Sequence, residues 1–284
     1  MIQFDAVTII IPHLGADKQQ EYSLDQCWTS LRETVPDIKI IVATNGRQCL
    51  EHRHTSDVDI GDQGQCKAVN AAVQTTNTEW IFVTNDDMIY APFWWQRLTS
   101  FYTTSLYKNI LCVSPKLVEP RKGAPTFIVE PFGGAGGDFQ KQKYLDYTDK
   151  KEKTDVLYVS GFNLPFLIRR DLWNTIGGYD VNYDPWGSNS DSDLEYKIKL
   201  AGIQPYQSQN SLVYHFSQTS GTSYPDNQGY WNKNWDYFIE KWGFPRTDNG
   251  IWEASFLIPT KEEGRRFLPK WEGKYKYNVR FETN

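Results

Sequence analysis

Residues 7–12 read Val-Thr-Ile-Ile-Ile-Pro, an apolar and β-branched run that ends at a proline. A run without alternating polar residues predicts a strand that is buried on both faces, as in a parallel sheet. Two similar runs, at residues 38–44 and 80–84, follow with helical patterns between them. Strands that alternate with helices over about the first 115 residues predict a mostly parallel, doubly wound α/β sheet with helices on both faces.

Polar residues follow these predicted strands at the points where the strands end. In this architecture ligands bind outside the carboxyl ends of the strands. We therefore expect one crevice that collects the residues found there, which are Pro12, His13, Thr44, Asn45, Asp62, Asn85, Asp86 and Asp87.

Composition narrows the class of protein. The 284 residues carry a net charge of −5 with a pI near 5.5, which argues against nucleic acid as the main partner. No apolar run approaches the ~18 residues of a membrane span, and the N-terminus lacks the pattern of a signal peptide. The cysteines, at positions 27, 49, 66 and 112, have no C-x-x-C spacing and predict reduced thiols in a cytoplasmic protein.

Aromatic residues make up 15% of the chain and include 11 tryptophans. Part of this excess fills the core, but it is also typical of surfaces on which sugar rings stack. Trp94 with Trp95, Trp186, and residues 230–242 are candidates for a platform under a sugar or for contact with a membrane surface. The sequence leaves that choice open.

Asp86 and Asp87 come directly after a predicted buried strand. Buried charges are costly unless they bind something, and carboxylate oxygens suit Mg²⁺ or Mn²⁺ with phosphates completing the octahedron. A solvated turn is the alternative. His215 ends a later strand, where it is either a buried structural histidine or a further ligand for such an ion.

A helix is expected from Asp191. Two pairs on it, Asp193 with Lys197 and Glu195 with Lys199, have the i,i+4 spacing of a solvated face. Asp191 has no basic partner at that spacing and lies toward the apolar stripe, so we expect it over the crevice. The helix dipole would keep it ionised, as a general base requires. Capping of the helix is its alternative role.

Two expectations concern the rest of the chain. Ser23 is a candidate N-cap for the first helix. Residues 133–137 are glycine-rich and residues 141–153 are charged, which together predict an exposed loop.

Taken together, these stretches resemble the family 2 glycosyltransferases, which are inverting nucleotide-sugar transferases of the GT-A fold. Residues 7–13, 42–47 and 62–70 match the family's first strand, its second turn and its N-x-G-x-x-x-A-x-N helix, and Asn85-Asp86-Asp87 matches its D-x-D metal motif. The second half follows the family order through Gly161, Arg169-Arg170, residues 177–180, residues 190–194, Gly202, residues 213–215 and residues 241–243. The resemblance covers about residues 7–243.

The resemblance implies a metal-dependent enzyme that moves a sugar from a nucleotide-diphosphate sugar, with UDP expected, to a hydroxyl of a glycan or glycoconjugate, as in polysaccharide biosynthesis. It assigns Asp191 as the base, and Asp87 and His215 as ligands of Mn²⁺ or Mg²⁺. It places the nucleotide against Pro12, His13, Thr44, Asn45, Asp62, Lys67, Asn85 and Asp86, and the acceptor against Gly161, Trp186 and Gly187.

Four positions depart from the family pattern. Thr44 stands where an Asp usually contacts uracil, and Asn85 replaces the first acid of the metal motif. Ser190 replaces the Glu before the base, and Val69 stands where Arg is frequent. The nucleotide base and the ribose contacts are therefore left open.

We expect a nucleotide-sugar-binding half over residues 1–115, an acceptor-binding and catalytic half of the same domain over residues 116–245, and a C-terminal extension over residues 246–284. The alternatives are a retaining transferase of the same fold, a non-catalytic carbohydrate-binding protein, and a nucleotidyltransferase. The last would carry a basic, glycine-rich loop after the first strand, which residues 12–18 match poorly.

Overall fold

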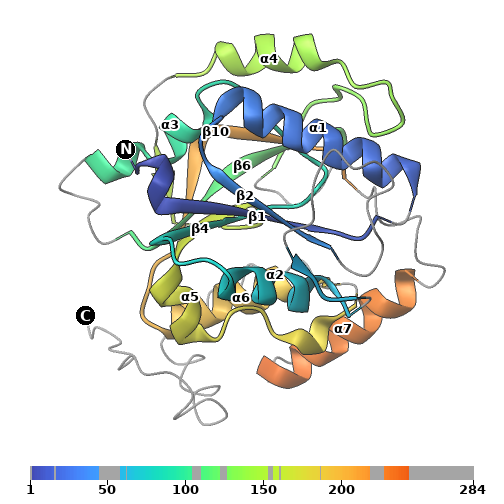
Figure 1. The fold of residues 1–284 in the computed structure, drawn as a ribbon, viewed down its shortest axis with the longest axis vertical. Coiled ribbons are helices and arrows are strands. Elements are labelled where there is room, and N and C mark those ends of the chain that lie inside the picture. Colours follow the sequence, from blue (N-terminus) through green and yellow to red (C-terminus); the bar gives the residue numbers. More distant parts are fainter. Residues whose placement is uncertain are drawn as a thin grey trace.

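The computed structural model describes residues 2–15, 17–44, 58–61, 63–103, 110–121, 127–152, 156–159, 161–185, 187–217 and 227–242. Its centre is a sheet of ten strands. Figure 1 shows this sheet between two layers of helices.

The strands are β1 (Val7–His13), β2 (Lys39–Thr44), β3 (Val58–Asp59), β4 (Trp80–Val83), β5 (Met88–Tyr90), β6 (Cys112–Glu119), β7 (Ile128–Val129), β8 (Leu157–Tyr158), β9 (Phe166–Arg169) and β10 (Tyr206–His215). The α-helices are α1 (Lys18–Thr34), α2 (Gln65–Gln74), α3 (Trp94–Leu98), α4 (Lys141–Asp149), α5 (Arg170–Ile176), α6 (Ser190–Leu200) and α7 (Asn227–Trp242). Short 3-10 turns are η1 (Phe4–Ala6), η2 (Ser100–Thr103) and η4 (Val181–Tyr183).

Strand order across the sheet is β3-β2-β1-β4-β9-β6-β10-β5, with β7 beside β6 and β8 beside β10. The first four of these strands run parallel, as do β6 with β10 and β6 with β7. β9 runs antiparallel between β4 and β6, and β5 and β8 run antiparallel to β10. The predicted, mostly parallel α/β sheet is confirmed, and β9 joins the strands of the two halves into one sheet.

β1 shows why its sequence is apolar throughout. Ile9 and Ile11 pack into the core that contains Leu24 of α1, whereas Ile10 packs into the opposite core, which contains Ala68 of α2. Successive side chains of a strand point to opposite faces, and both faces are covered. Helices α1 and α4 lie on one side, and α2, α5, α6 and α7 on the other (Figure 1).

Two local predictions are wrong. The N-cap of α1 is Asp17, whose Oδ1 accepts the backbone N–H groups of Gln19 and Gln20 at 2.9 Å, while Ser23 lies inside the helix. Residues 141–149 form α4 instead of a loop. Its Tyr144 is buried, and the hydroxyl donates to the carbonyls of Ile89 and Leu212.

Trp94 and Trp95 belong to the core and do not form an exposed platform. They are 1% and 0% exposed, and both rings contact Phe82 of β4. Their proposed contact with a sugar or a membrane is therefore wrong, because the sheet covers them. Within the described part of the chain, no helix has both the length and the apolar character needed to cross a membrane.

Candidate functional site

A cavity of about 300 Å³ opens at the carboxyl ends of β1, β4 and β10, beside the N-termini of α2 and α6. This is the edge at which an α/β sheet of this type binds ligands. The lining residues are Pro12, His13, Leu14, Gln20, Gln65, Asn85, Asp86, Asp87, Leu164, Pro185, Gly187, Ser188, Ser190, Asp191, His215 and Trp231.

Many of the predicted site residues meet at this cavity. Those that line it are Pro12, His13, Asn85, Asp86, Asp87, Gly187, Asp191 and His215. They come from four separate stretches of sequence, and the strand ends bring them together. Asn45, Asp62 and Trp186, together with the predicted extension 246–284, lie outside the described residues.

Thr44, Lys67 and Gly161 are not among the lining residues. Thr44 is buried at the end of β2, and the backbone N–H of Lys67 donates to Oδ2 of Asp184 at 3.0 Å. Gly161 has a φ of +85°, and a Cβ there would lie 2.9 Å from Oε1 of Gln207. Packing alone explains this glycine, and its contact with an acceptor stays a prediction.

Asp87 and His215 are adjacent, although Asp87 lies in the turn before β5 and His215 is the last residue of β10. Nε2 of His215 is 3.2 Å from Oδ2 of Asp87, and Nδ1 is 2.7 Å from Oε1 of Glu119. Burial lowers the pKa of His215, but the two carboxylates outweigh it and raise this pKa to about 10. Glu119 was not among the predicted site residues, although the sequence carries a signal for it, because it is an acid at the end of the buried strand β6.

This arrangement fits a divalent cation. Around an octahedral ion with bonds of ~2.1 Å, neighbouring donor atoms lie about 3.0 Å apart, close to the separation of the Asp87 and His215 atoms. Histidines that bind metals usually donate their second N–H to a carboxylate, which is the position of Glu119. No group of three or more His, Cys, Asp or Glu among the described residues is arranged to hold an ion by itself.

Asp86 points to a different partner from Asp87. Its Oδ2 lies 2.6 Å from Nδ1 of His13, and Nε2 of the same imidazole lies 3.2 Å from Oε1 of Glu21. Burial raises the pKa of Asp86, and the hydrogen bond from His13 opposes this shift. The two neighbouring carboxylates therefore separate, one toward β1 and one toward β10.

Asp191 lies in the first turn of α6, partly buried at the cavity. The N-cap position belongs to Asn189, and Oδ1 of Asp191 accepts a hydrogen bond from the hydroxyl of Tyr179 at 3.0 Å. Burial raises the pKa of Asp191 to about 6, although Tyr179 and the charge of His215 act against the shift. The helix dipole thus does not hold this pKa low, and a carboxylate that titrates near 6 is a stronger proton acceptor than an ordinary Asp.

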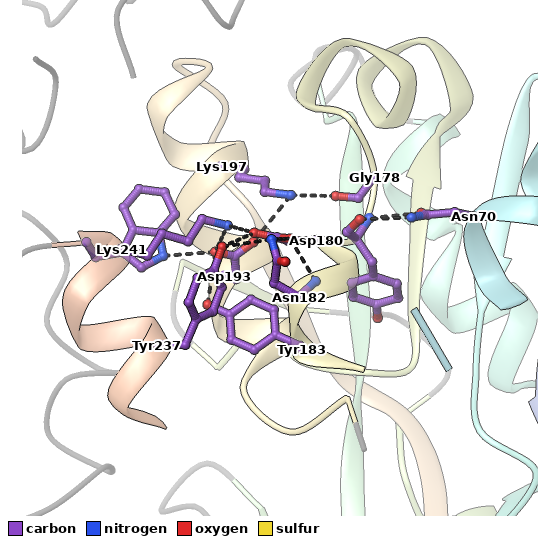
Figure 2. Close-up of polar contacts among 11 residues, drawn as sticks. Asn70, Gly178, Asp180, Asn182, Tyr183, Asp193, Lys197, Tyr237 and Lys241 are labelled. Carbon is purple, nitrogen blue, oxygen red and sulfur yellow. Dashed lines mark hydrogen bonds and ion pairs between the residues drawn. The ribbon is translucent and has the colours of Figure 1, made fainter. Parts of the chain in front are cut away.

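Asp193 is not on a solvated face, so that prediction is wrong. The residue is fully buried, because α7 packs over this side of α6. Nζ of Lys241 lies 2.5 Å from its Oδ1, Nζ of Lys197 lies 3.3 Å from its Oδ2, and the indole N–H of Trp242 donates to Oδ1 at 2.9 Å. Figure 2 shows the lysines of α6 and α7 around this carboxylate.

No family model and no curated protein matches this sequence. Among solved structures, the chain is similar to the crystal structure of GalNAc-T7 with UDP, GalNAc and Mn²⁺, with a TM-score of 0.52 and 15% sequence identity. The similarity covers 74% of this chain and 42% of that chain. At this level of identity the likeness concerns the fold, and the chain has the Rossmann-like α/β architecture of the GT-A glycosyltransferases.

Proposed function

We propose that this protein is a glycosyltransferase that moves a sugar from a nucleotide-diphosphate sugar to a hydroxyl of a glycan or glycoconjugate. The observation that carries the proposal is that one cavity brings together a carboxylate–imidazole pair suited to a cation and a separate carboxylate whose pKa is near 6. The fold shared with GalNAc-T7, a protein solved with UDP and Mn²⁺, supports the same donor and ion classes.

Asp87 and His215 would hold Mn²⁺ or Mg²⁺, and Glu119 would orient the imidazole. Such an ion neutralises the charge that develops on a diphosphate leaving group. His13, whose other ring nitrogen contacts Glu21, holds Asp86 at the carboxyl end of β1. There Asp86 would contact the donor together with Pro12 and Asn85. UDP is the nucleotide we expect, and Thr44, Asn45, Asp62 and Lys67 remain predicted contacts to it.

Asp191 would take the proton of the acceptor hydroxyl. Tyr179 donates to Oδ1, and we assign the incoming proton to Oδ2. As the proton moves to Asp191, the acceptor oxygen would bond to the anomeric carbon from the face opposite the nucleotide. The bond between that carbon and the diphosphate oxygen would break, the nucleoside diphosphate would leave, and this one displacement would invert the configuration. Gly187, which lines the cavity, and Trp186, which precedes it in the sequence, remain predicted contacts to the acceptor.

Two of the alternatives predict different outcomes. A retaining transferase would give the opposite anomer, and a carbohydrate-binding protein would need neither the ion pair nor a carboxylate of raised pKa. A cytoplasmic location and a place in polysaccharide biosynthesis stay predictions from the sequence.

The test is a screen of UDP-, GDP- and dTDP-sugars for hydrolysis and transfer with Mn²⁺, with Mg²⁺ and with EDTA. We expect one nucleotide class to react, only with metal, and Asp87→Ala to abolish the metal-enhanced binding of the nucleotide in calorimetry. Asp149→Ala, an exposed carboxylate at the end of α4, is the matched control. NMR of the product anomer separates inversion from retention. The absence of reaction and of metal-dependent binding for every donor would refute the proposal.

A further inference from the structure

The tryptophans in the described part of the chain are unequally placed. Those buried in the cores are Trp80, Trp94, Trp95, Trp173 and Trp242. Trp235 of α7 packs against the core and stacks on Phe238, and Trp28 lies under the guanidinium of Arg32. Trp231 is partly exposed, like Trp28 and Trp235, but it differs from all of these tryptophans because it lines the cavity that contains Asp191.

Helix α7 is fixed next to Trp231. Asn234, one turn further along, is buried, and its Nδ2 donates to the carbonyl of Tyr183 at 2.7 Å and to the hydroxyl of Ser188 at 3.1 Å. Ser188 lies three residues before Asp191 and also lines the cavity. The rotation of α7 about its axis is therefore set by the same loop that leads into the first turn of α6.

The C-terminal end of α7 is also held, by contacts with Asp180 and with Asp193 of α6. Lys241 contacts both Asp180 and Asp193 (Figure 2). The indole N–H of Trp242 donates to Asp193, which is two residues after Asp191. Two separate attachments hold the helix to the elements that carry Asp191. A ring on this helix is thus positioned before any ligand binds, which lowers the entropic cost of binding.

The chemistry around Trp231 matches a sugar ring. Leu164 and Pro185 give apolar surface, while Ser188 and Asp191 give hydrogen-bonding groups in the same cavity. A pyranose has apolar C–H faces and a rim of hydroxyls, so it satisfies both kinds of group when it stacks on an indole.

We propose that Trp231 is the surface on which the acceptor sugar stacks, so that the enzyme selects a pyranose acceptor and presents one of its hydroxyls to Asp191. This inference rests on the proposed function and names the acceptor class of the same site. It gives one of the chain's many aromatic residues, Trp231 of α7, a role in binding the acceptor.

The experiment compares Trp231→Ala and Trp231→Phe with Trp235→Ala, which removes an indole from the same helix outside the cavity lining. Acceptors are the methyl glycosides of glucose, galactose and N-acetylglucosamine, with the donor found in the screen. We expect Trp231→Ala to raise the acceptor KM at least about tenfold, and Trp231→Phe to stay within about threefold of wild type. In Trp231→Ala, donor hydrolysis without acceptor and nucleotide affinity with Mn²⁺ should change far less than the acceptor KM. Trp235→Ala should lower the Tm but leave the acceptor KM unchanged.

An unchanged acceptor KM in Trp231→Ala overturns the inference, and so does an equal loss of acceptor-independent hydrolysis, which would place the ring at the donor. If Trp231→Ala does not fold, the acceptor KM of Trp231→Leu is compared with that of Trp231→Phe. A raised KM in the leucine variant alone supports a stacking ring, and equal KM values overturn it. A wild-type protein that shows neither reaction nor metal-dependent binding with any sugar nucleotide overturns the proposed function instead. In that case, saturation-transfer NMR measures whether the three methyl glycosides bind at Trp231. Equal signals for wild type and Trp231→Ala overturn the role of Trp231 in binding a sugar.

Discussion

The hydroxyl of Tyr179 donates a hydrogen bond to Oδ1 of Asp191 at 3.0 Å, and α2 holds the backbone of the same tyrosine. Asn70 of α2 accepts the backbone N–H of Tyr179 at 3.0 Å and donates to its carbonyl at 2.8 Å. Gly178 is required at this contact, because a Cβ there would lie 2.5 Å from Oδ1 of Asn70. One side chain of the first half thus positions, through Tyr179, the carboxylate that we propose as the base.

The first prediction is that the transfer rate falls at acidic pH, because Asp191 becomes protonated there. A base must be ionised, and the pKa of this carboxyl is raised from 3.8 to about 6. The rate constant kcat/KM should therefore fall with decreasing pH below about 6, with a slope of one. A pH profile of transfer at constant Mn²⁺ measures it, and a rate that holds to pH 4.5 would contradict the assignment.

Asp191→Asn should separate catalysis from stability. The amide keeps the shape but accepts no proton, so turnover should drop by ~10²–10⁴-fold. The raised pKa means that the folded protein holds a proton on Asp191 between pH 4 and 6, so the contribution of this group to stability falls as pH rises through that window. The Tm of Asp191→Asn at pH 7 should therefore equal or exceed that of wild type. Wild-type turnover would remove Asp191 from the mechanism.

Tyr179→Phe should move the acidic limb to higher pH. The hydrogen bond from Tyr179 lowers the pKa of Asp191, so its loss leaves the effect of burial less opposed. Activity at pH 6.5 should fall, and activity at pH 8.5 should recover toward the wild-type value. A merely structural tyrosine would reduce activity equally at both pH values, which the two profiles distinguish.

Glu119→Gln should weaken the cation site. The amide can still accept from the imidazole but has no charge to strengthen it as a ligand, and losses of such outer partners cost about 10–100-fold in metal affinity. Calorimetric titration of Mn²⁺ in the presence of the nucleotide measures the change. Glu33→Gln on the exposed side of α1 is the control and should bind the ion as wild type does.

The sequence was sufficient for the sheet and for much of the crevice, because a buried parallel strand has a local signature. Runs such as residues 7–12 mark both the strand and its carboxyl end, and the polar residue that follows marks the ligand side. Asp87 and His215 were found in this way, whereas Asp191 was predicted from its place in the first turn of a helix. Their roles remain predictions, since geometry places them in one cavity without showing what binds there.

The sequence did not predict the environment of a residue whose contacts are distant along the chain. Asp193 and Lys197 have the same i,i+4 spacing whether water or a helix covers them, and the helix that covers them is α7, whose Lys241 follows 48 residues after Asp193. The sequence of β9 does not indicate whether it runs parallel or antiparallel to its neighbours β4 and β6. Trp94 and Trp231 are equally aromatic in sequence, and only the packing of the helices separates the buried ring from the cavity ring.

The last prediction tests that buried cluster. Lys241→Met removes one of two lysines that face Asp180 and Asp193, and leaves a carboxylate buried with less compensation. Breaking a buried ion pair in this way costs about 3–5 kcal/mol of the free energy of unfolding, measured by urea denaturation. Lys233→Met, an exposed lysine on the same helix, should change stability by less than ~0.5 kcal/mol.

The double variant Asp193→Asn with Lys241→Met decides whether charge is the cause. It removes one carboxylate together with the lysine, so the remaining Asp180 and Lys197 balance, and the second substitution should restore part of the stability that the first one lost. If the cluster were the solvated face that its spacing suggests, each single variant would cost at most ~1 kcal/mol and the two costs would add. A strong single effect with partial recovery in the double variant would instead mean that α7 is held to the helix of Asp191 by buried charge.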